Sequence, residues 1–180
     1  NFTMGPDGKM YSRMLGGNLV RIDVENARGE NLTNGDLVGT KDGSAYGLVF
    51  DPQDENVFYF SNNDKHCIYK YDLRTKECAC WAGQEGKSGY LDGPIGQAMF
   101  NKPGQMCVDS EGNIILTDTE NHCIRKITMS TGYVSTLAGK PQNSGYVNGS
   151  AEDAQFKKPL GICIDNDDVM YIGDSENRAI

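Results

Sequence analysis

Two long stretches of this chain repeat each other at one fixed spacing. The first runs from Trp81 to Pro103 and the second from Leu137 to Pro159, an offset of 56 residues. The repeated residues are mainly glycines, aromatics and turn formers, among them Gly83 and Gly139, Ser88 and Ser144, Tyr90 and Tyr146, and Phe100 and Phe156. The same offset relates Asp118 to Asp174, beyond the two stretches. A repeat of this size built from short β segments indicates propeller blades or array units, because each unit has apolar faces that only its neighbours can bury.

Each repeat contains four short segments separated by turn residues. In the best copy these segments begin at Met106, Ile114, Cys123 and Tyr133. Asp, Gly, Asn and Ser residues lie between them, and this pattern predicts four antiparallel strands. The first two segments are apolar on both faces, as expected for inner strands. The polar pair Arg125 and Lys126 indicates that the third strand begins to meet solvent.

The expected fold class is therefore all-β, a β-propeller of four-stranded antiparallel blades. The repeat divides the chain into blades at residues 46–102 and 103–158 and an incomplete blade at 159–180. Residues 1–45 are expected to form a diverged blade. Little more than three blades fit into 180 residues, so we expect further blades or a companion domain to cover the open sheet edges.

The charge balance of the chain is acidic. There are 25 Asp and Glu residues against 17 Lys and Arg residues, which gives a net charge of −8. Such a surface repels a phosphate backbone, so nucleic acid is not an expected partner. The sequence has no run of about 18 apolar residues, and no transmembrane segment is expected.

The six cysteines indicate packing rather than a disulfide framework. Four of them repeat at the common offset, Cys67 with Cys123 and Cys107 with Cys163. Cys107 and Cys163 alternate with larger apolar residues in inner strands, and we expect both thiols to be buried and reduced between blades. Cys78 and Cys80 are separated by one residue, a spacing that does not match a zinc knuckle.

The order of residues within one unit resembles the NHL repeat. The residues that carry the resemblance are Pro103, Asp109, Gly112, Asn113, Asp118, Thr119, Asn121, Ile124, Gly132, Val134, Ala138, Gly139, Asn148, Gly149, Ala154, Phe156 and Pro159. Gln105, Cys123 and Asn148 depart from it, since the repeat usually has Gly, Arg and Asp there. NHL repeats form β-propellers, commonly of six blades. The long loops are most similar to those of bacterial envelope proteins in which an immunoglobulin-like TIG domain often accompanies the propeller.

The resemblance implies that the turn between the second and third strands shares one face with the long connection to the next blade. Ligands usually meet that face, around a central channel. His66 and His122 lie in equivalent turns, and imidazoles from separate strands can hold zinc or act as acids and bases. Arg178 takes the same position in the next copy, which argues for a structural role instead. Asp118 and Asn121 are expected to hydrogen-bond turn amides.

Other polar residues of this face are candidate ligand contacts. Tyr90 and Tyr146 could stack on a sugar ring, although their repetition is also typical of packing between blades. Lys102 and Lys158 precede prolines at the channel mouth, where they would attract an anion or form a solvated rim. The full set of candidates is Asp64, His66, Tyr90, Lys102, Glu120, His122, Tyr146, Lys158 and Arg178.

Two classes of function are open at this point. The first is a binding module of a bacterial cell-envelope protein, extracytoplasmic, which holds a glycan or other nutrient, a peptide or a partner protein. The second is a propeller hydrolase or lyase with a metal-assisted site at the central channel, since propellers host both classes. No Gly-x-Ser-x-Gly elbow and no phosphate-binding glycine loop occur in the sequence. We therefore assign no catalytic residue and no cofactor, zinc and calcium included.

Overall fold

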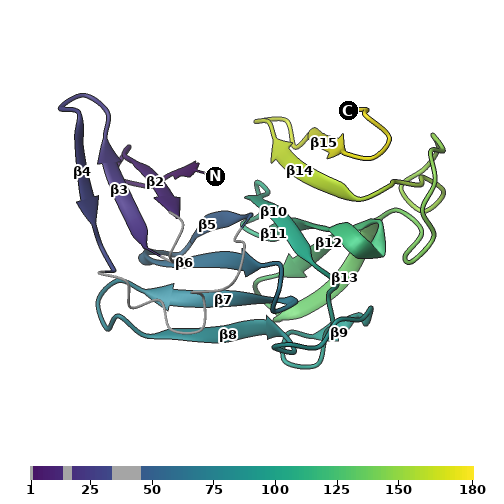
Figure 1. The fold of residues 1–180 in the computed structure, drawn as a ribbon, viewed down its shortest axis with the longest axis horizontal. Helices are drawn as coiled ribbons and strands as arrows, with labels where there is room; N and C mark the ends of the chain where they lie inside the picture. The colour runs from purple at the N-terminus through teal and green to yellow at the C-terminus, as the bar shows by residue number, and fades with distance from the viewer. Residues whose placement is uncertain (1, 14–17, 34–45) are drawn as a thin grey trace.

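The computed structural model describes residues 2–13, 18–33 and 46–180, which form mostly short antiparallel strands (Figure 1). In this part of the chain the helical structure is limited to one 3-10 turn, η1 (Thr119–Asn121). Four sheets follow one another along the chain, three of them with four or more strands. The predicted all-β class with four-stranded antiparallel sheets is confirmed.

Each sheet is built from strands that are consecutive or nearly consecutive in the chain. The first sheet contains β1 (Phe2–Met4), β2 (Met10–Arg13), β3 (Leu19–Asp23) and β4 (Arg28–Asn31). The second contains β5 (Leu48–Asp51), β6 (Asp54–Asn62), β7 (Cys67–Asp72) and β8 (Cys78–Gly83). The third contains β10 (Pro103–Val108), β11 (Ile114–Asp118), β12 (Cys123–Thr128) and β13 (Tyr133–Ala138), with β9 (Gly93–Pro94) at its outer edge. The last contains β14 (Pro159–Ile164) and β15 (Met170–Asp174).

The first sheet occupies the part of the chain for which the sequence predicts a diverged blade at residues 1–45. Residues 1, 14–17 and 34–45 of that range lie outside the described residues. The exact boundaries of the four units remain predictions.

Short polar turns join the strands within a sheet. The carboxylate of Asp109 accepts the backbone N–H of Asn113 at 2.7 Å, and Gly112 between them has a φ of +80° that suits glycine. One repeat later, Asp165 accepts the backbone N–H of Val169 at 3.0 Å. Aspartate at the end of an inner strand therefore forms the same turn in successive sheets.

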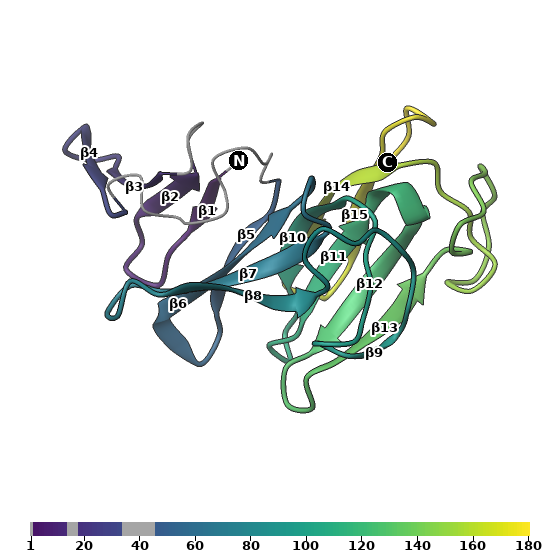
Figure 2. The same ribbon diagram turned by 60° about the horizontal axis from the view of Figure 1, so that its bottom comes forward.

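The first strand of each sheet lies on the inside of a curved array. In Figure 1, β5, β10 and β14 converge beside the N-terminal strand, and the later strands of each sheet lie farther out. Figure 2 shows the second and third sheets with their broad faces turned toward each other. β10 contacts both β5 and β14. The inner strands therefore surround one common space.

Hydroxyl groups join the second sheet to the third and the third sheet to the last. The hydroxyl of Ser61 donates to the carbonyl of Gly104 at 2.7 Å. One repeat later, the hydroxyl of Thr117 donates to the carbonyl of Leu160 at 3.0 Å. A Cβ atom at Gly104 would collide with the side chain of Thr117. Glycine at this position therefore allows the main chains of neighbouring inner strands to approach closely.

Apolar side chains fill the space between the second and third sheets. Tyr59 and Ile68 meet Leu116 and Ile127 in one buried cluster. Phe100, from the connection that leads into β10, is fully buried in the same cluster. Burial of a side chain of this size contributes about 1.5–3 kcal/mol. The long connection is thus part of the core as well as a link between sheets.

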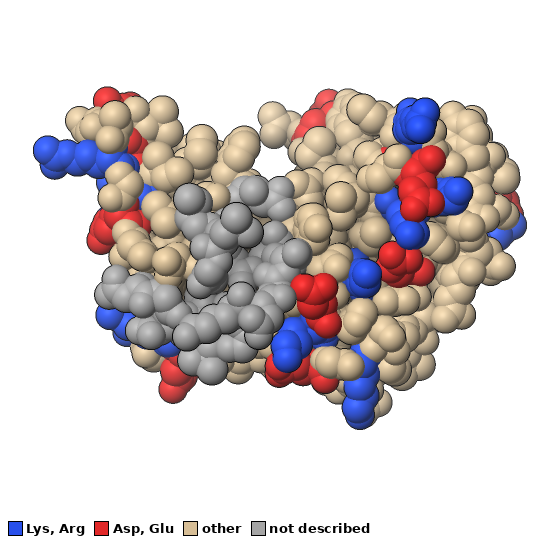
Figure 3. Space-filling view, in the orientation of Figure 1, with Lys and Arg blue, Asp and Glu red and all other residues tan. Residues whose placement is uncertain are grey.

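The charged side chains on the face shown in Figure 3 are interspersed, with Lys and Arg beside Asp and Glu. This surface therefore presents no field of a single sign over its described residues. No helix in the described part of the chain has the length and apolar character needed to cross a membrane.

Candidate functional site

The turn after the second strand of a sheet meets the connection that leads into the same sheet. Asp118 accepts the backbone N–H of Asn101 at 2.7 Å, and Asp174 accepts that of Lys157 at 2.7 Å. We call the side of the molecule formed by residues 62–66, 101–103, 118–122, 157–159 and 174–178 the loop face. These contacts bring the two kinds of segment together as the family resemblance implied.

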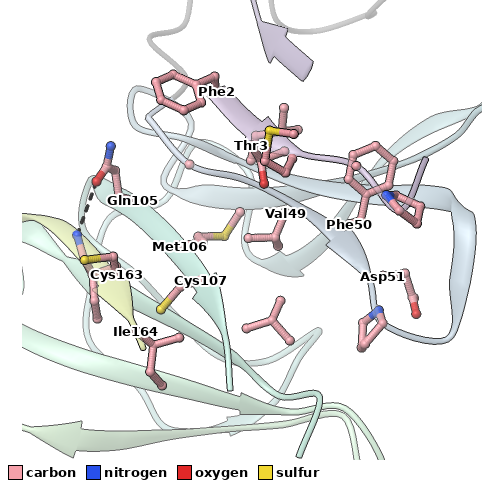
Figure 4. A pocket seen from close by; sticks show the side chains of 18 of the residues that line it. Phe2, Thr3, Val49, Phe50, Asp51, Gln105, Met106, Cys107, Cys163 and Ile164 are labelled. Carbon is pink, nitrogen blue, oxygen red and sulfur yellow. Dashed lines mark hydrogen bonds between the residues drawn. The ribbon is translucent and has the colours of Figure 1, made fainter. Parts of the chain in front are cut away.

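A hollow of about 1090 Å³ lies between the inner strands β1, β5, β10 and β14 (Figure 4). Its walls are mainly apolar, with Met106 of β10 at their centre. Gln105 adds a polar group, and its side-chain oxygen accepts the backbone N–H of Ile162 at 3.3 Å. Because β10 begins at Pro103, within the loop face, this face borders one end of the hollow.

Two thiols also line the hollow. Figure 4 shows Cys107 on β10 and Cys163 on β14 among its wall residues. Cys163 is exposed and Cys107 is only partly buried, so the prediction that both are buried between blades is wrong. Both thiols line the hollow, and Cys107 also packs on the apolar cluster that includes Ile162 of the last sheet. Burial still raises the pKa of Cys107 to about 12.

The two histidines of the loop face hold the connections in place. Nδ1 of His66 accepts the backbone N–H of Lys102 at 3.1 Å, and Nδ1 of His122 accepts that of Lys158 at 3.2 Å. An imidazole nitrogen accepts a hydrogen bond only when it carries no proton. Burial lowers the pKa of His66, and the nearby Lys102 cation lowers it further, which favours this neutral form. The structure therefore supports a structural role for both histidines.

The remaining charged candidates differ in their partners. Lys158 forms ion pairs with Glu120 at 3.4 Å and with Glu176 at 3.1 Å, and the hydrogen bond to Glu176 raises its pKa. Lys102, one repeat earlier, forms no ion pair with any residue that the structure describes. Arg178 has a φ of +55°, close to the value of +59° at His122, and takes the same turn position. Asp64 is exposed in the corresponding turn of the second sheet.

The two tyrosines lie in different surroundings. Tyr90 is half-buried, its ring lies 4.7 Å from the Arg125 guanidinium, and its hydroxyl is 2.7 Å from that of Thr136. Burial raises the pKa of Tyr90. Tyr146 is 67% exposed. Only Tyr146 of this pair presents an open aromatic face to solvent.

Arg125 is the central polar residue of the third sheet, and the expectation that it lies at the solvent boundary is wrong. It is fully buried because the connection before β10 covers it. Its guanidinium donates to Asp118 at 2.7 Å and to Asp92 at 2.6 Å. It also donates to the carbonyls of Leu91 and Met99 at 3.0 and 3.2 Å.

This network of hydrogen bonds holds the loop-face residue Asp118 to the connection that leads into β10. Asp118 is also fully buried, which raises its pKa to about 6, and Arg125 opposes that rise. A buried charge that loses its partner costs about 3–5 kcal/mol. The carboxylate of Asp92 also accepts the backbone N–H of Thr136 at 3.2 Å, which ties the connection to β13. Arg125 and its partners therefore position the loop face without touching the hollow.

The structure brings several predicted residues together and leaves others apart. Lys158 lies beside Glu120, and His66 lies beside Lys102. Tyr90 belongs to the Arg125 network, and Tyr146 stands on an exposed loop. Within residues 2–13, 18–33 and 46–180, no group of three His, Cys, Asp or Glu side chains is arranged to hold a metal ion.

Comparison with known proteins identifies the repeat. Residues 100–127 match the NHL repeat family. The chain is 28% identical over 170 residues to the chloroplastic protein SUPPRESSOR OF QUENCHING 1 of Arabidopsis thaliana, an alignment that covers 90% of this chain and 16% of that protein. The chain thus corresponds to a small part of this relative.

Two solved bacterial structures resemble almost the whole chain. A structural genomics protein of unknown function from Bacteroides thetaiotaomicron has a TM-score of 0.88 and 27% identity, covering 99% of this chain and 45% of that one. An auxiliary nutrient binding protein from the same organism has a TM-score of 0.77 and 29% identity, with the same coverage. The chain spans less than half the length of these structures, and its sheets correspond to propeller blades.

Proposed function

Since this chain is an NHL-repeat protein built from β-propeller blades, we propose that it is a binding module of a bacterial cell-envelope protein. The ligand that we propose is a glycan or another nutrient, held where the loop face meets the hollow. Similarity to a bacterial auxiliary nutrient binding protein over 99% of the chain supports this class of ligand. The same similarity supports an extracytoplasmic location.

The observation that carries the proposal is the hollow itself. Its volume of about 1090 Å³ matches the size of sites that enclose small organic ligands, which run to about 1,000 Å³. The walls combine apolar strand residues with Gln105 and with the acidic residues Asp51, Asp54 and Glu55 around the turn between β5 and β6. A mainly apolar site with a few polar groups is the usual composition of a ligand pocket. The turns around it are fixed by the Arg125 network, so little order must be gained on binding.

Two residues of the long connections are suited to contact a sugar. The exposed ring of Tyr146 offers a stacking surface for the apolar face of a pyranose. Lys102 has no ion-pair partner among the described residues, so its ammonium group is available for a carboxylate or sulfate substituent. Lys158 is less suitable because Glu120 and Glu176 already neutralise it.

The test is titration calorimetry of the protein with a panel of neutral and acidic oligosaccharides. Tyr146→Ala is expected to weaken binding of the best ligand by about tenfold, the equivalent of about 1.4 kcal/mol. Tyr133→Ala is the matched control, because Tyr133 is 47% exposed on the outer strand β13. Lys102→Asn is expected to weaken acidic ligands selectively, and asparagine tolerates the φ of +55° found there.

Three results would contradict the proposal. Equal losses in the Tyr146 and Tyr133 variants would remove Tyr146 and its connection from the binding site. Metal-dependent conversion of an oligosaccharide would favour the hydrolase or lyase class instead. Detection of the protein only after lysis of the source cells, and never by surface or periplasmic labelling, would contradict the envelope location.

A further inference from the structure

Two cysteines of the second sheet face each other across neighbouring strands. β7 and β8 run side by side in Figure 1, with Tyr69 paired to Cys80 and Cys67 paired to Gly83. Alternate residues of a strand share a face, so Cys67 and Cys80 are diagonal neighbours on one face of the sheet. The register shifts between Ile68 and Tyr69, which brings Cys80 toward the end of the strand where Cys67 lies. Both belong to the apolar cluster on that face, in which Cys67 and Tyr69 are buried and Cys80 is partly buried.

We propose that Cys67 and Cys80 are a redox-active pair that forms a reversible disulfide between β7 and β8. The pair is specific to this sheet. Cys123 repeats Cys67 in the third sheet, but Thr136 stands where the second sheet has Cys80. Among the described cysteines the inner-strand thiols Cys107 and Cys163 face the hollow and not this sheet.

The two thiols have different chemical roles. Cys67 is fully buried, and the neighbouring Cys80 thiol together with burial raises the pKa of Cys67. Cys80 is only partly buried, and the neighbouring Cys67 thiol lowers the pKa of Cys80. In the reduced form the Cys80 thiol also approaches the carbonyl of Gly83, at 3.7 Å. Cys80 is therefore the accessible nucleophile, and Cys67 is the resolving thiol behind it.

The oxidant is a small disulfide such as oxidised glutathione, or a thiol–disulfide oxidoreductase. The Cys80 thiolate attacks one sulfur of that disulfide, which breaks the S–S bond, releases one thiolate and leaves a mixed disulfide on Cys80. Cys67 then loses its proton to solvent and attacks the Cys80 sulfur, which releases the second thiolate. The protein loses two electrons and two protons, and the oxidant gains the two electrons as a pair of thiols.

The disulfide would lock an outer strand that the sheet otherwise holds by main-chain bonds. β8 is the outermost strand of its sheet, and the chain leaves it at Gly83 to form the first long connection. The bond would close a loop from residue 67 to residue 80. A loop of that length stabilises a chain of this size enough to raise Tm by about 5–10 °C.

The experiment uses the whole chain in a Cys163→Ser background, because the exposed Cys163 thiol would add mixed disulfides. The reduced protein is equilibrated with oxidised glutathione and digested without reductant, and the peptides are identified by mass spectrometry. We expect a linked peptide pair that contains Cys67 and Cys80, the rise in Tm stated above, and reversal of both by a reductant. A protein that keeps all its thiols, or that links other cysteines instead, would overturn the proposal.

Single substitutions distinguish the role of the Cys67 thiol from that of the Cys80 thiol. Cys67→Ser is expected to accumulate the mixed disulfide at Cys80, because the resolving thiol is gone, and Cys80→Ser is expected to form no link. Cys123→Ser is the matched control and should leave the link intact. Thr136→Cys, introduced together with Cys80→Ser, should join Cys123 to position 136, because the strand register is the same in both sheets. The double variant tests whether this strand register lets two thiols join, even if Cys67→Ser does not fold. If the double variant forms no disulfide, the proposal is contradicted.

Discussion

The two long connections, residues 84–102 and 140–158, share much of their sequence but differ in how they pack. In the first, Tyr90 lies against Arg125 and Asp92 binds it. In the second, Tyr146 is 67% exposed, and Asn148 stands where the first has Asp92. The first connection packs on β12 and β13, whereas the sheet that follows the second contains only β14 and β15. Tyr146 has no counterpart of Arg125 to pack on in this chain, because the position one repeat after Arg125 lies past Ile180.

The largest difference between the two connections is expected from loss of Arg125. Arg125→Met should lower the free energy of unfolding by about 3–5 kcal/mol, because Asp118 would remain buried without its cation. Urea denaturation measures this loss. Limited proteolysis should then cut first within residues 84–102. Lys126→Met is the control, since its ion pairs with Asp109 and Glu111 lie partly in solvent and contribute at most about 1 kcal/mol. Equal losses of unfolding free energy in Arg125→Met and Lys126→Met would contradict the central role of Arg125 in holding the first connection.

A smaller difference is expected from the asparagines that tie each connection to its turn. Asn121 donates to the carbonyl of Gly89 at 2.8 Å, and Asn177 donates to that of Gly145 at 2.6 Å. Asn121 is buried and Asn177 is half-buried. Asn121→Ala should therefore cost about 1–3 kcal/mol, and Asn177→Ala about 0.5–1.5 kcal/mol. Thermal unfolding of the two variants shows which one loses more stability. A larger loss of stability in Asn177→Ala than in Asn121→Ala would contradict our interpretation.

Removal of one hydroxyl from each tyrosine should have a still smaller effect. Tyr90→Phe loses the hydrogen bond to Thr136 and should cost about 0.5–1.5 kcal/mol. Tyr146→Phe should change stability by no more than about 0.5 kcal/mol, because its ring is exposed. Chemical denaturation of both variants provides the measurement. Equal effects would show that the second connection is as well packed as the first.

The smallest effect concerns the pH dependence at the first connection. The pKa of His66 is lowered in the folded state, by burial and then by Lys102, while Asp64 opposes this shift. Its contribution to stability is therefore present above the unfolded pKa of about 6.5 and is lost as the pH falls through the folded pKa. His66→Asn should flatten the stability curve below neutrality, and Lys102→Asn should make the loss smaller, because the folded pKa of His66 then lies closer to its unfolded value. Unfolding free energies measured between pH 5 and pH 8 test both, and an unchanged curve in the His66 variant would contradict the assignment.

The 56-residue repeat predicted the strands, the sheets and the residues of the loop face. It did not predict the burial of Arg125, because Tyr69 occupies the equivalent position and the partner Asp92 lies far from Arg125 in the sequence. Alternation along β12 places polar and apolar residues side by side, and this pattern alone is also typical of a solvent-facing strand. Burial of Cys163 was wrongly predicted for a related reason. An apolar strand predicts a covered face, but only the arrangement of the sheets shows whether a neighbour or a hollow lies opposite.

The hydroxyl–carbonyl hydrogen bonds between sheets have an evolutionary consequence. Ser61 and Thr117 reach across to carbonyl groups of the main chain, which every amino acid possesses, and not to particular side chains. A blade can therefore dock on any neighbour that keeps a small residue or an open main chain at the crossing point. Duplication or deletion of a whole 56-residue unit would preserve these hydrogen bonds, as in other arrays whose stability is a sum over neighbouring units. The number of blades can thus change in whole steps while the contacts between neighbouring sheets stay the same.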